Sequence, residues 1–77
     1  MNKEYVNEYR QLGLKIAYYR KLRGFTQEGL AEMINKSAIF IGHVEAPNVD
    51  KAISLDTLFD IAKALDVPVY KFLTFED

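Results

Sequence analysis

The chain has 77 residues, of which 49% are hydrophobic and 27% are charged, and its formal net charge is −1 at pH 7. This size and composition predict one small globular domain over residues 1–77, and they exclude both a second core and a disordered chain. The absence of cysteine excludes disulfides and thiolate metal sites. The first eight residues are too polar for a signal peptide and no apolar run reaches membrane-spanning length, so we expect a cytoplasmic protein.

The charges are distributed unevenly along the chain. Residues 1–36 carry seven Lys or Arg against four Glu, whereas residues 37–77 carry three Lys against seven acidic residues. This asymmetry is compatible with a basic face on an acidic molecule. Ordinary solvated helix surfaces explain the same charge pattern equally well.

The first part of the chain has the spacing of a helix. Apolar and aromatic residues at positions 5, 9, 12, 16 and 19 predict a helix from about Tyr5 to Leu22. Gly24 follows, and glycine suits the left-handed conformation in which many helices end.

Residues 26–45 predict two short helices joined by a tight turn. Thr26 and Ser37 each provide a side-chain oxygen that can cap a helix, which places the helices at about 27–34 and 38–45. Asn35 tolerates the left-handed backbone that a sharp turn needs. The apolar residues that would face each other across the two helices are Leu30, Ala31, Ile34, Ile41 and Val44. This is the pattern of a helix-turn-helix, and it indicates binding to DNA.

The remaining residues complete an all-α architecture. Residues 46–53 are rich in turn formers and predict a loop, and Ser54 can cap a fourth helix. The predicted buried side of that helix consists of Leu55, Leu58, Phe59, Ile61, Ala62 and Leu65. Pro68 suits the first turn of a short fifth helix that ends at Leu73, and residues 75–77 form a tail. The sequence therefore predicts a compact bundle of five helices.

Over residues 10–73 the chain resembles the lambda repressor-like (XRE family) helix-turn-helix domains. The residues that carry this resemblance are Leu12-Gly13, Ile16, Arg20, Thr26-Gln27, Leu30-Ala31, Ile41, Val44-Glu45 and the apolar positions between 55 and 65. The resemblance implies that residues 38–45 form a recognition helix in the major groove of double-stranded DNA. The side chains that would face base edges are Ala38, Ile39, Gly42 and His43.

The same resemblance assigns further roles. It implies that Gln27 holds a phosphate, and that Arg20 and Glu45 form a structural ion pair between the first and third helices. Additional candidate phosphate contacts are Arg23, Lys36, Ser37 and Lys51. For a single surface lysine or arginine plain solvation is the alternative, but Lys36 and Lys51 are favoured because they flank the predicted recognition helix.

The predicted recognition helix lacks the side chains that read DNA bases most strongly. It contains no Arg, Gln or Asn among its base-facing residues, so we expect modest specificity per subunit. Ile39 suits thymine methyl groups. Phe40 is expected to pack on the second helix or on the following loop, and the alternative places its ring against the sugar-phosphate backbone. His43 is either a surface histidine near phosphate or guanine or a packing residue. It has no second ligand at metal-binding spacing, so no metal site is predicted.

No residue pattern supports catalysis, and no cofactor is implied. We therefore predict a sequence-specific DNA-binding transcriptional regulator of phage-repressor type, acting as a homodimer on a near-palindromic site. Candidate dimer contacts are Tyr70, Phe72 and Phe75, although the apolar residues near the C-terminus can instead close the core. The alternative function is a protein-interaction module, such as an antitoxin or adaptor, with weak or lost DNA binding and a toxin or antirepressor as partner.

Overall fold

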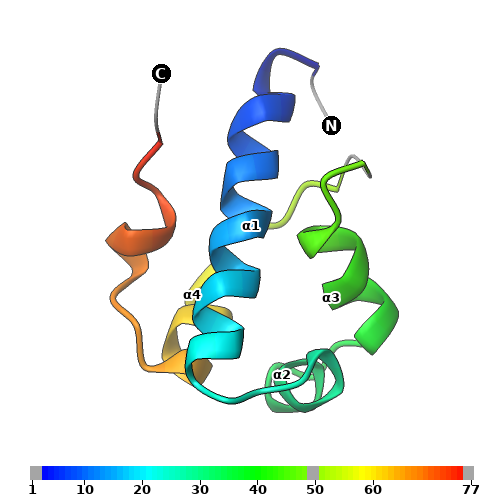
Figure 1. The fold of residues 1–77 in the computed structure, drawn as a ribbon, viewed down its shortest axis with the longest axis vertical. Coiled ribbons are helices and arrows are strands. Elements are labelled where there is room, and N and C mark those ends of the chain that lie inside the picture. The colour runs from blue at the N-terminus through cyan, green and yellow to red at the C-terminus, as the bar shows by residue number, and fades with distance from the viewer. Residues whose placement is uncertain (1–2, 49–50, 76–77) are drawn as a thin grey trace.

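The computed structural model describes residues 3–48 and 51–75, which form four α-helices and two short 3-10 helices (Figure 1). The α-helices are α1 (Val6–Leu22), α2 (Gln27–Met33), α3 (Ala38–Glu45) and α4 (Leu55–Leu65). The 3-10 helix η1 (Lys3–Tyr5) precedes α1, and η2 (Val69–Phe72) follows α4. The described ranges contain no strand, so the fold is all-α. No helix within them is long and apolar enough to cross a membrane.

The prediction of a fifth α-helix is wrong. Residues 69–72 form the 3-10 helix η2, and Pro68 lies before it in an extended conformation with ψ of 136°. Only four residues take part, and short connecting segments of this length commonly adopt the tighter 3-10 geometry. The bundle therefore contains four α-helices in its described part.

Three helices begin at the predicted capping residues. The hydroxyl oxygens of Thr26, Ser37 and Ser54 accept hydrogen bonds from backbone N–H groups in the first turns of α2, α3 and α4 at 2.9, 3.0 and 3.1 Å. Each bond satisfies an N–H group that has no partner within the helix. The capping pattern thus correctly placed the starts of these helices.

Three helices end on a residue with left-handed backbone. Gly24, Asn35 and Asp66 have φ of 81°, 59° and 55°, and the first two were predicted. In each case the N–H of the next residue bonds to a carbonyl five residues earlier, at 3.0, 2.9 and 3.0 Å. This is the Schellman motif, and it satisfies carbonyl groups that the helix end leaves without partners.

Helix α1 lies at the centre of the fold. It packs against α3 on one side and against α4 and η2 on the other (Figure 1). At Gly13 the contact between α1 and α3 is so close that a Cβ atom would overlap the carbonyl oxygen of Val44. The hydrophobic core consists of Leu12, Ile16, Leu30, Ala31, Ile34, Ile41, Val44, Leu58, Ile61, Ala62, Leu65, Val67 and Phe72.

Two residues predicted for the buried side of α4 lie at the surface. Leu55 is 61% exposed and Phe59 is 50% exposed. The buried stripe of α4 is centred on Leu58, Ile61 and Leu65. Since successive residues rotate by about 100° around a helix, Leu55 and Phe59 fall at the edge of that stripe.

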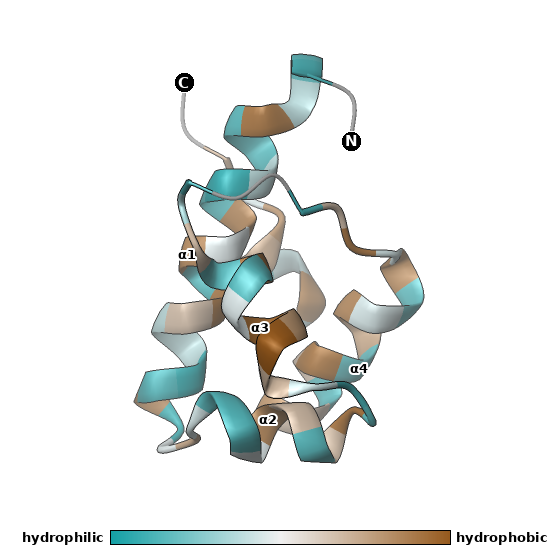
Figure 2. Cartoon of the chain, turned by 90° about the vertical axis from the view of Figure 1, so that its right-hand side faces the viewer, coloured by the Kyte–Doolittle hydropathy of each residue, from teal (hydrophilic) through white to brown (hydrophobic). Residues whose placement is uncertain are grey.

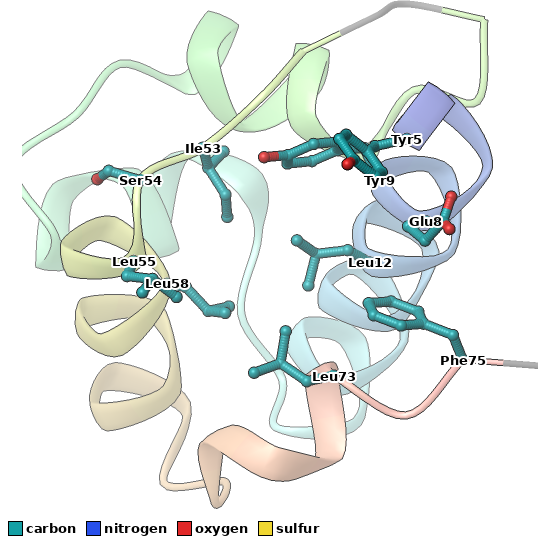
Figure 3. Close-up of a pocket in the computed structure, with 10 residues that line it drawn as sticks. All are labelled: Tyr5, Glu8, Tyr9, Leu12, Ile53, Ser54, Leu55, Leu58, Leu73 and Phe75. Atoms are coloured by element: carbon teal, nitrogen blue, oxygen red, sulfur yellow. The ribbon is translucent and has the colours of Figure 1, made fainter. Parts of the chain in front are cut away.

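An apolar groove of about 270 Å³ opens beside this edge. Figure 3 shows side chains from the start of α1, the start of α4 and the C-terminal segment pointing into a common space. Apolar lining residues include Leu12, Ile53, Leu58, Leu73 and Phe75, and Glu8 lies at the rim. The groove lies on the side of α1 that carries α4 and η2.

Candidate nucleic-acid interface

Helices α2 and α3 form a helix-turn-helix whose inner faces are buried. Leu30 and Ile41 have no exposed surface, and Ala31 is 2% exposed where the two helices meet. The turn between the helices contains Asn35 in its left-handed conformation. Burial of these side chains fixes the angle of α3 relative to α2, because the packed surfaces leave little room for rearrangement.

A buried ion pair fixes the other end of α3. Arg20 Nε donates to Glu45 Oε2 at 2.7 Å and Arg20 Nη2 donates to Glu45 Oε1 at 2.9 Å. The two side chains are only 8% and 6% exposed. Arg20 Nη1 also donates to the backbone carbonyl of Phe25 at 2.7 Å. The guanidinium therefore links the last residue of α3 both to α1 and to the segment that leads into α2.

Gln27 adds to this network rather than lying free at the surface. Its Nε2 donates to Glu45 Oε1 at 3.1 Å. Its Oε1 lies 3.5 Å from the position that a Cβ atom would take on Gly42. An amide nitrogen carries two hydrogens, so one remains for the predicted phosphate contact while the other holds Glu45.

The opposite side of α3 faces solvent. Ile39 is 71% exposed, and His43, four residues further along, is also exposed. Ala38 and Gly42 are half-buried beside them. Figure 2 looks onto α3, and strong hydrophobic colouring marks its first turns. All four residues predicted to read bases therefore lie along α3 with at least part of their surface accessible.

The other predicted phosphate contacts are spread over a wider surface. Ser37 Oγ caps α3, but a hydroxyl that accepts can also donate its own hydrogen. Lys36, which precedes α3 in the chain, and Lys51, which follows it, both lie over the ring of Phe40. Arg23 Nη2 donates to the carbonyl of Asp66 at 3.0 Å, so the structure ties it to the end of α4 rather than to α3.

The sequence did not predict one contact that positions the loop after α3. Arg10 Nε donates to the carbonyl oxygen of Pro47 at 3.0 Å and so holds the start of the loop after α3 against α1. The two residues lie 37 positions apart and the acceptor is a backbone oxygen, so no residue pattern could reveal the contact. Two residues of the predicted loop, at positions 49 and 50, lie outside the described residues, as do residues 76 and 77 of the predicted tail.

The candidate dimer contacts divide into two groups. Tyr70 and Phe75 are 57% and 41% exposed and remain available to a partner. Phe72 has no exposed surface, and its ring packs edge-on against Tyr19 with centroids 5.3 Å apart. The prediction of Phe72 as a dimer contact is therefore wrong. This side chain of η2 lies in the core, in agreement with the alternative that apolar residues near the C-terminus close the core.

Among the described residues, no group of three or more His, Cys, Asp or Glu gathers where a metal ion could bind. The chemistry of the exposed α3 surface is instead that of methyl groups, one imidazole and flanking ammonium groups. Together with the capped, rigidly packed α2 and α3, these features define a helix-turn-helix protein.

Comparison with known proteins gives the same class. The family model described as helix-turn-helix matches residues 16–72, and the chain belongs to this family, in its XRE-type branch. The chain is 36% identical over 63 residues to the control protein C.SmaI of Serratia marcescens, covering 82% of this chain and 73% of that protein.

Two solved structures share the fold. The restriction-modification controller protein C.AhdI from Aeromonas hydrophila superposes with a TM-score of 0.82 at 23% identity, covering 90% of this chain and 97% of that chain. The DNA-binding domain of BldD gives a TM-score of 0.74 at 29% identity, covering 96% of this chain and all of that chain (100%).

Proposed function

We propose that the protein is a sequence-specific DNA-binding transcriptional regulator without catalytic activity, in which α3 is the recognition helix. The observation that carries this proposal is the two-sided character of α3. Its inner face is fixed by the Arg20–Glu45 pair and the buried apolar contacts, while Ile39 on its outer face is 71% exposed. A major groove about 12 Å wide admits a helix presented in this way.

Each residue of the outer face has a distinct role in this proposal. Ile39 contacts thymine methyl groups, and His43 contacts a guanine edge. Ala38 and Gly42 have short or absent side chains, which lets the bases approach the helix backbone. Gln27, Ser37, Lys36 and Lys51 hold phosphates and set the orientation of the domain. Arg23 is a more distant phosphate contact in this proposal, made by the guanidinium N–H groups that do not bond to Asp66.

The protein acts as a homodimer in this proposal, because one such domain contacts only one half-site. The supporting observation is the apolar surface beside the groove of Figure 3. The exposed large apolar residues that line it are Tyr5, Leu55, Leu73 and Phe75, and Tyr70 of η2 is also exposed. Sedimentation of the protein with and without its DNA site tests this part; a monomer under both conditions would refute it.

The names of the relatives narrow the biological setting. One is called a control protein and another a restriction-modification controller protein. We therefore place the operator of this chain in a promoter of a restriction-modification system, with the region upstream of its own gene as the first candidate.

The experiment that tests α3 as the reading element compares wild type with Ile39→Ala and His43→Ala on operator and unrelated duplexes by fluorescence anisotropy. We expect both variants to lose affinity for the operator and to keep their weak affinity for unrelated DNA, because base contacts carry the sequence information. Equal losses on both duplexes would assign these residues to backbone contacts and contradict the proposed reading set.

A second candidate function is supported by the composition of the same surface. Ile39 is the most exposed of the large hydrophobic side chains in the described residues, and the base-facing set contains no Arg, Asn or Gln. Such a surface also fits a protein partner, for example a toxin or an antirepressor. Co-purification of a stoichiometric protein, together with no preference among duplexes selected from a random pool, would favour this function.

A further inference from the structure

Two lysines converge on one aromatic ring at the start of α3. Lys36 Nζ lies 5.5 Å and Lys51 Nζ lies 5.3 Å from the centroid of the Phe40 ring. Lys36 belongs to the turn before α3, whereas Lys51 belongs to the segment between α3 and α4. Phe40 therefore gathers positive charge from two segments of the chain, one before and one after the proposed recognition helix.

We infer that Lys36, Phe40 and Lys51 form a clamp for the DNA backbone, in which the Phe40 ring positions both ammonium groups for phosphate. This inference rests on the proposed function, and it identifies a positioning residue and a two-lysine phosphate site within the interface.

The charge arrangement supports a site for an anion. Both ammonium groups lie within 5.5 Å of one centroid, so they are no more than about 11 Å apart, and an anion midway between them lies within about 6 Å of each, less than the screening length of about 8 Å at 0.15 M salt. Their positive potentials therefore add at ordinary ionic strength. Within the described ranges, neither lysine forms an ion pair with a carboxylate that would cancel this potential.

The ring explains why both lysines lie beside Phe40. The face of an aromatic ring carries negative electrostatic potential and attracts an ammonium group. Phe40 itself is held, because its N–H donates to Ser37 Oγ at 3.0 Å and its side chain packs against the hydrophobic core. The lysines are thus attracted to a fixed platform, which offsets their mutual repulsion before any phosphate arrives.

The position of the platform matches the geometry of a helix in a groove. Phe40 follows Ile39 directly and so lies about 100° around α3 from it. If Ile39 points at the base edges, a neighbour displaced by this angle faces the sugar-phosphate wall of the groove. The clamp therefore lies where a phosphate can be contacted. It orients the protein on the DNA and does not read the base sequence.

The test measures DNA affinity against salt for Lys36→Met, Lys51→Met and wild type. Each lysine variant should lower the slope of log K against log salt by about 0.9, and should weaken operator and unrelated duplex alike, by roughly fivefold at 0.15 M salt. The matched control is Lys15→Met. Lys15 Nζ makes the same kind of contact, 5.3 Å from the Phe75 ring, but it lies on the side of α1 that faces the C-terminal segment. Loss of its charge should leave the salt slope unchanged.

The role of the ring is tested by Phe40→Leu, which keeps an apolar side chain, and by Phe40→Tyr, which keeps the aromatic face. Phe40→Leu should weaken DNA binding by about two- to fivefold, which corresponds to the energy of a cation–π contact at an exposed site. Phe40→Tyr should bind DNA with the affinity of wild type. Removal of Lys51 should then cost less in the Phe40→Leu background than in wild type.

Two results would overturn the inference. Unchanged salt slopes for both lysine variants would exclude the clamp, and additive losses for Phe40→Leu and Lys51→Met would exclude positioning by the ring. Either result can occur while wild type still prefers its operator, so failure of the clamp is distinguishable from failure of the proposed function. Thermal melts of every variant separate a loss of folding from a loss of binding.

Discussion

The buried ion pair between α1 and α3 gives the sharpest test of how the interface is held. Glu45→Gln preserves the shape of the side chain but removes its charge, and Arg20 then stays in place with its side chain 8% exposed and without a counter-charge. An uncompensated buried charge costs about 3–5 kcal/mol, whereas an exposed pair contributes about 0–1 kcal/mol. Burial therefore decides between a large and a negligible effect.

The expected loss is large for a domain of this size. At 0.05–0.15 kcal/mol per residue, 77 residues correspond to a total stability of roughly 4–12 kcal/mol. Because the introduced amide oxygen can still accept from Arg20, we expect about 3 kcal/mol, the lower end of the range. Each kcal/mol shifts the Tm of a small domain by about 4–8 °C, so the Tm should fall by at least about 12 °C.

Urea unfolding and thermal melts followed by circular dichroism measure this loss. The matched control is Glu32→Gln, which removes an exposed carboxylate from α2 and should change stability by no more than about 0.5 kcal/mol. The double variant Arg20→Met, Glu45→Leu removes both charges and should recover most of the loss. A Glu45→Gln variant within about 1 kcal/mol of wild type would refute the reasoning, because the pair would then behave like one in water.

Three further substitutions follow from the packing and exposure of single residues. Gly13→Ala should destabilise the fold by about 1–3 kcal/mol in urea, because its Cβ atom overlaps the Val44 carbonyl oxygen; a stabilised variant would contradict the close contact. Phe72→Ala should lower the free energy of unfolding by about 3–5 kcal/mol, since the ring is fully buried. A loss below about 1 kcal/mol would contradict the buried position of Phe72. Ile39→Ala should change the free energy of unfolding by less than about 0.5 kcal/mol while weakening operator binding; a large drop in Tm would show that Ile39 supports the fold instead.

The sequence predicted best those features that depend on neighbouring residues. Thr26, Ser37 and Ser54 cap the helices that they were expected to cap, because an N-cap needs only a short polar side chain before a helical segment. The left-handed Gly24 and Asn35 follow for the same local reason. These residues define the helix-turn-helix, which explains why this part of the fold was accessible from sequence.

Features that depend on distant packing were harder to predict. The apolar periodicity of α4 includes Leu55 and Phe59, but the other elements cover only the stripe on Leu58, Ile61 and Leu65. The direction in which η2 turns Phe72 is set by the three-dimensional fit against Tyr19. Periodicity gives the side of a helix that is apolar, and it does not give the width of the neighbour that covers it.

The candidate site shows the same division. The exposed positions of Ile39 and His43 follow from the helical register of α3 once its cap is known. The engagement of Gln27 with Glu45, and the meeting of Lys36 and Lys51 on Phe40, join residues from separate segments. No spacing rule brings these groups together, so only the structure reveals them.

The central claim is that this chain recognises a DNA sequence through α3. Fluorescence anisotropy of the full chain on duplex from the region upstream of its own gene, against unrelated duplex and across a salt series, tests it most directly. The account predicts a gap of roughly a thousandfold or more between the two duplexes, with affinity falling as salt rises. Equal weak binding to both, and again to duplexes selected from a random pool, would contradict sequence-specific recognition and favour a protein partner.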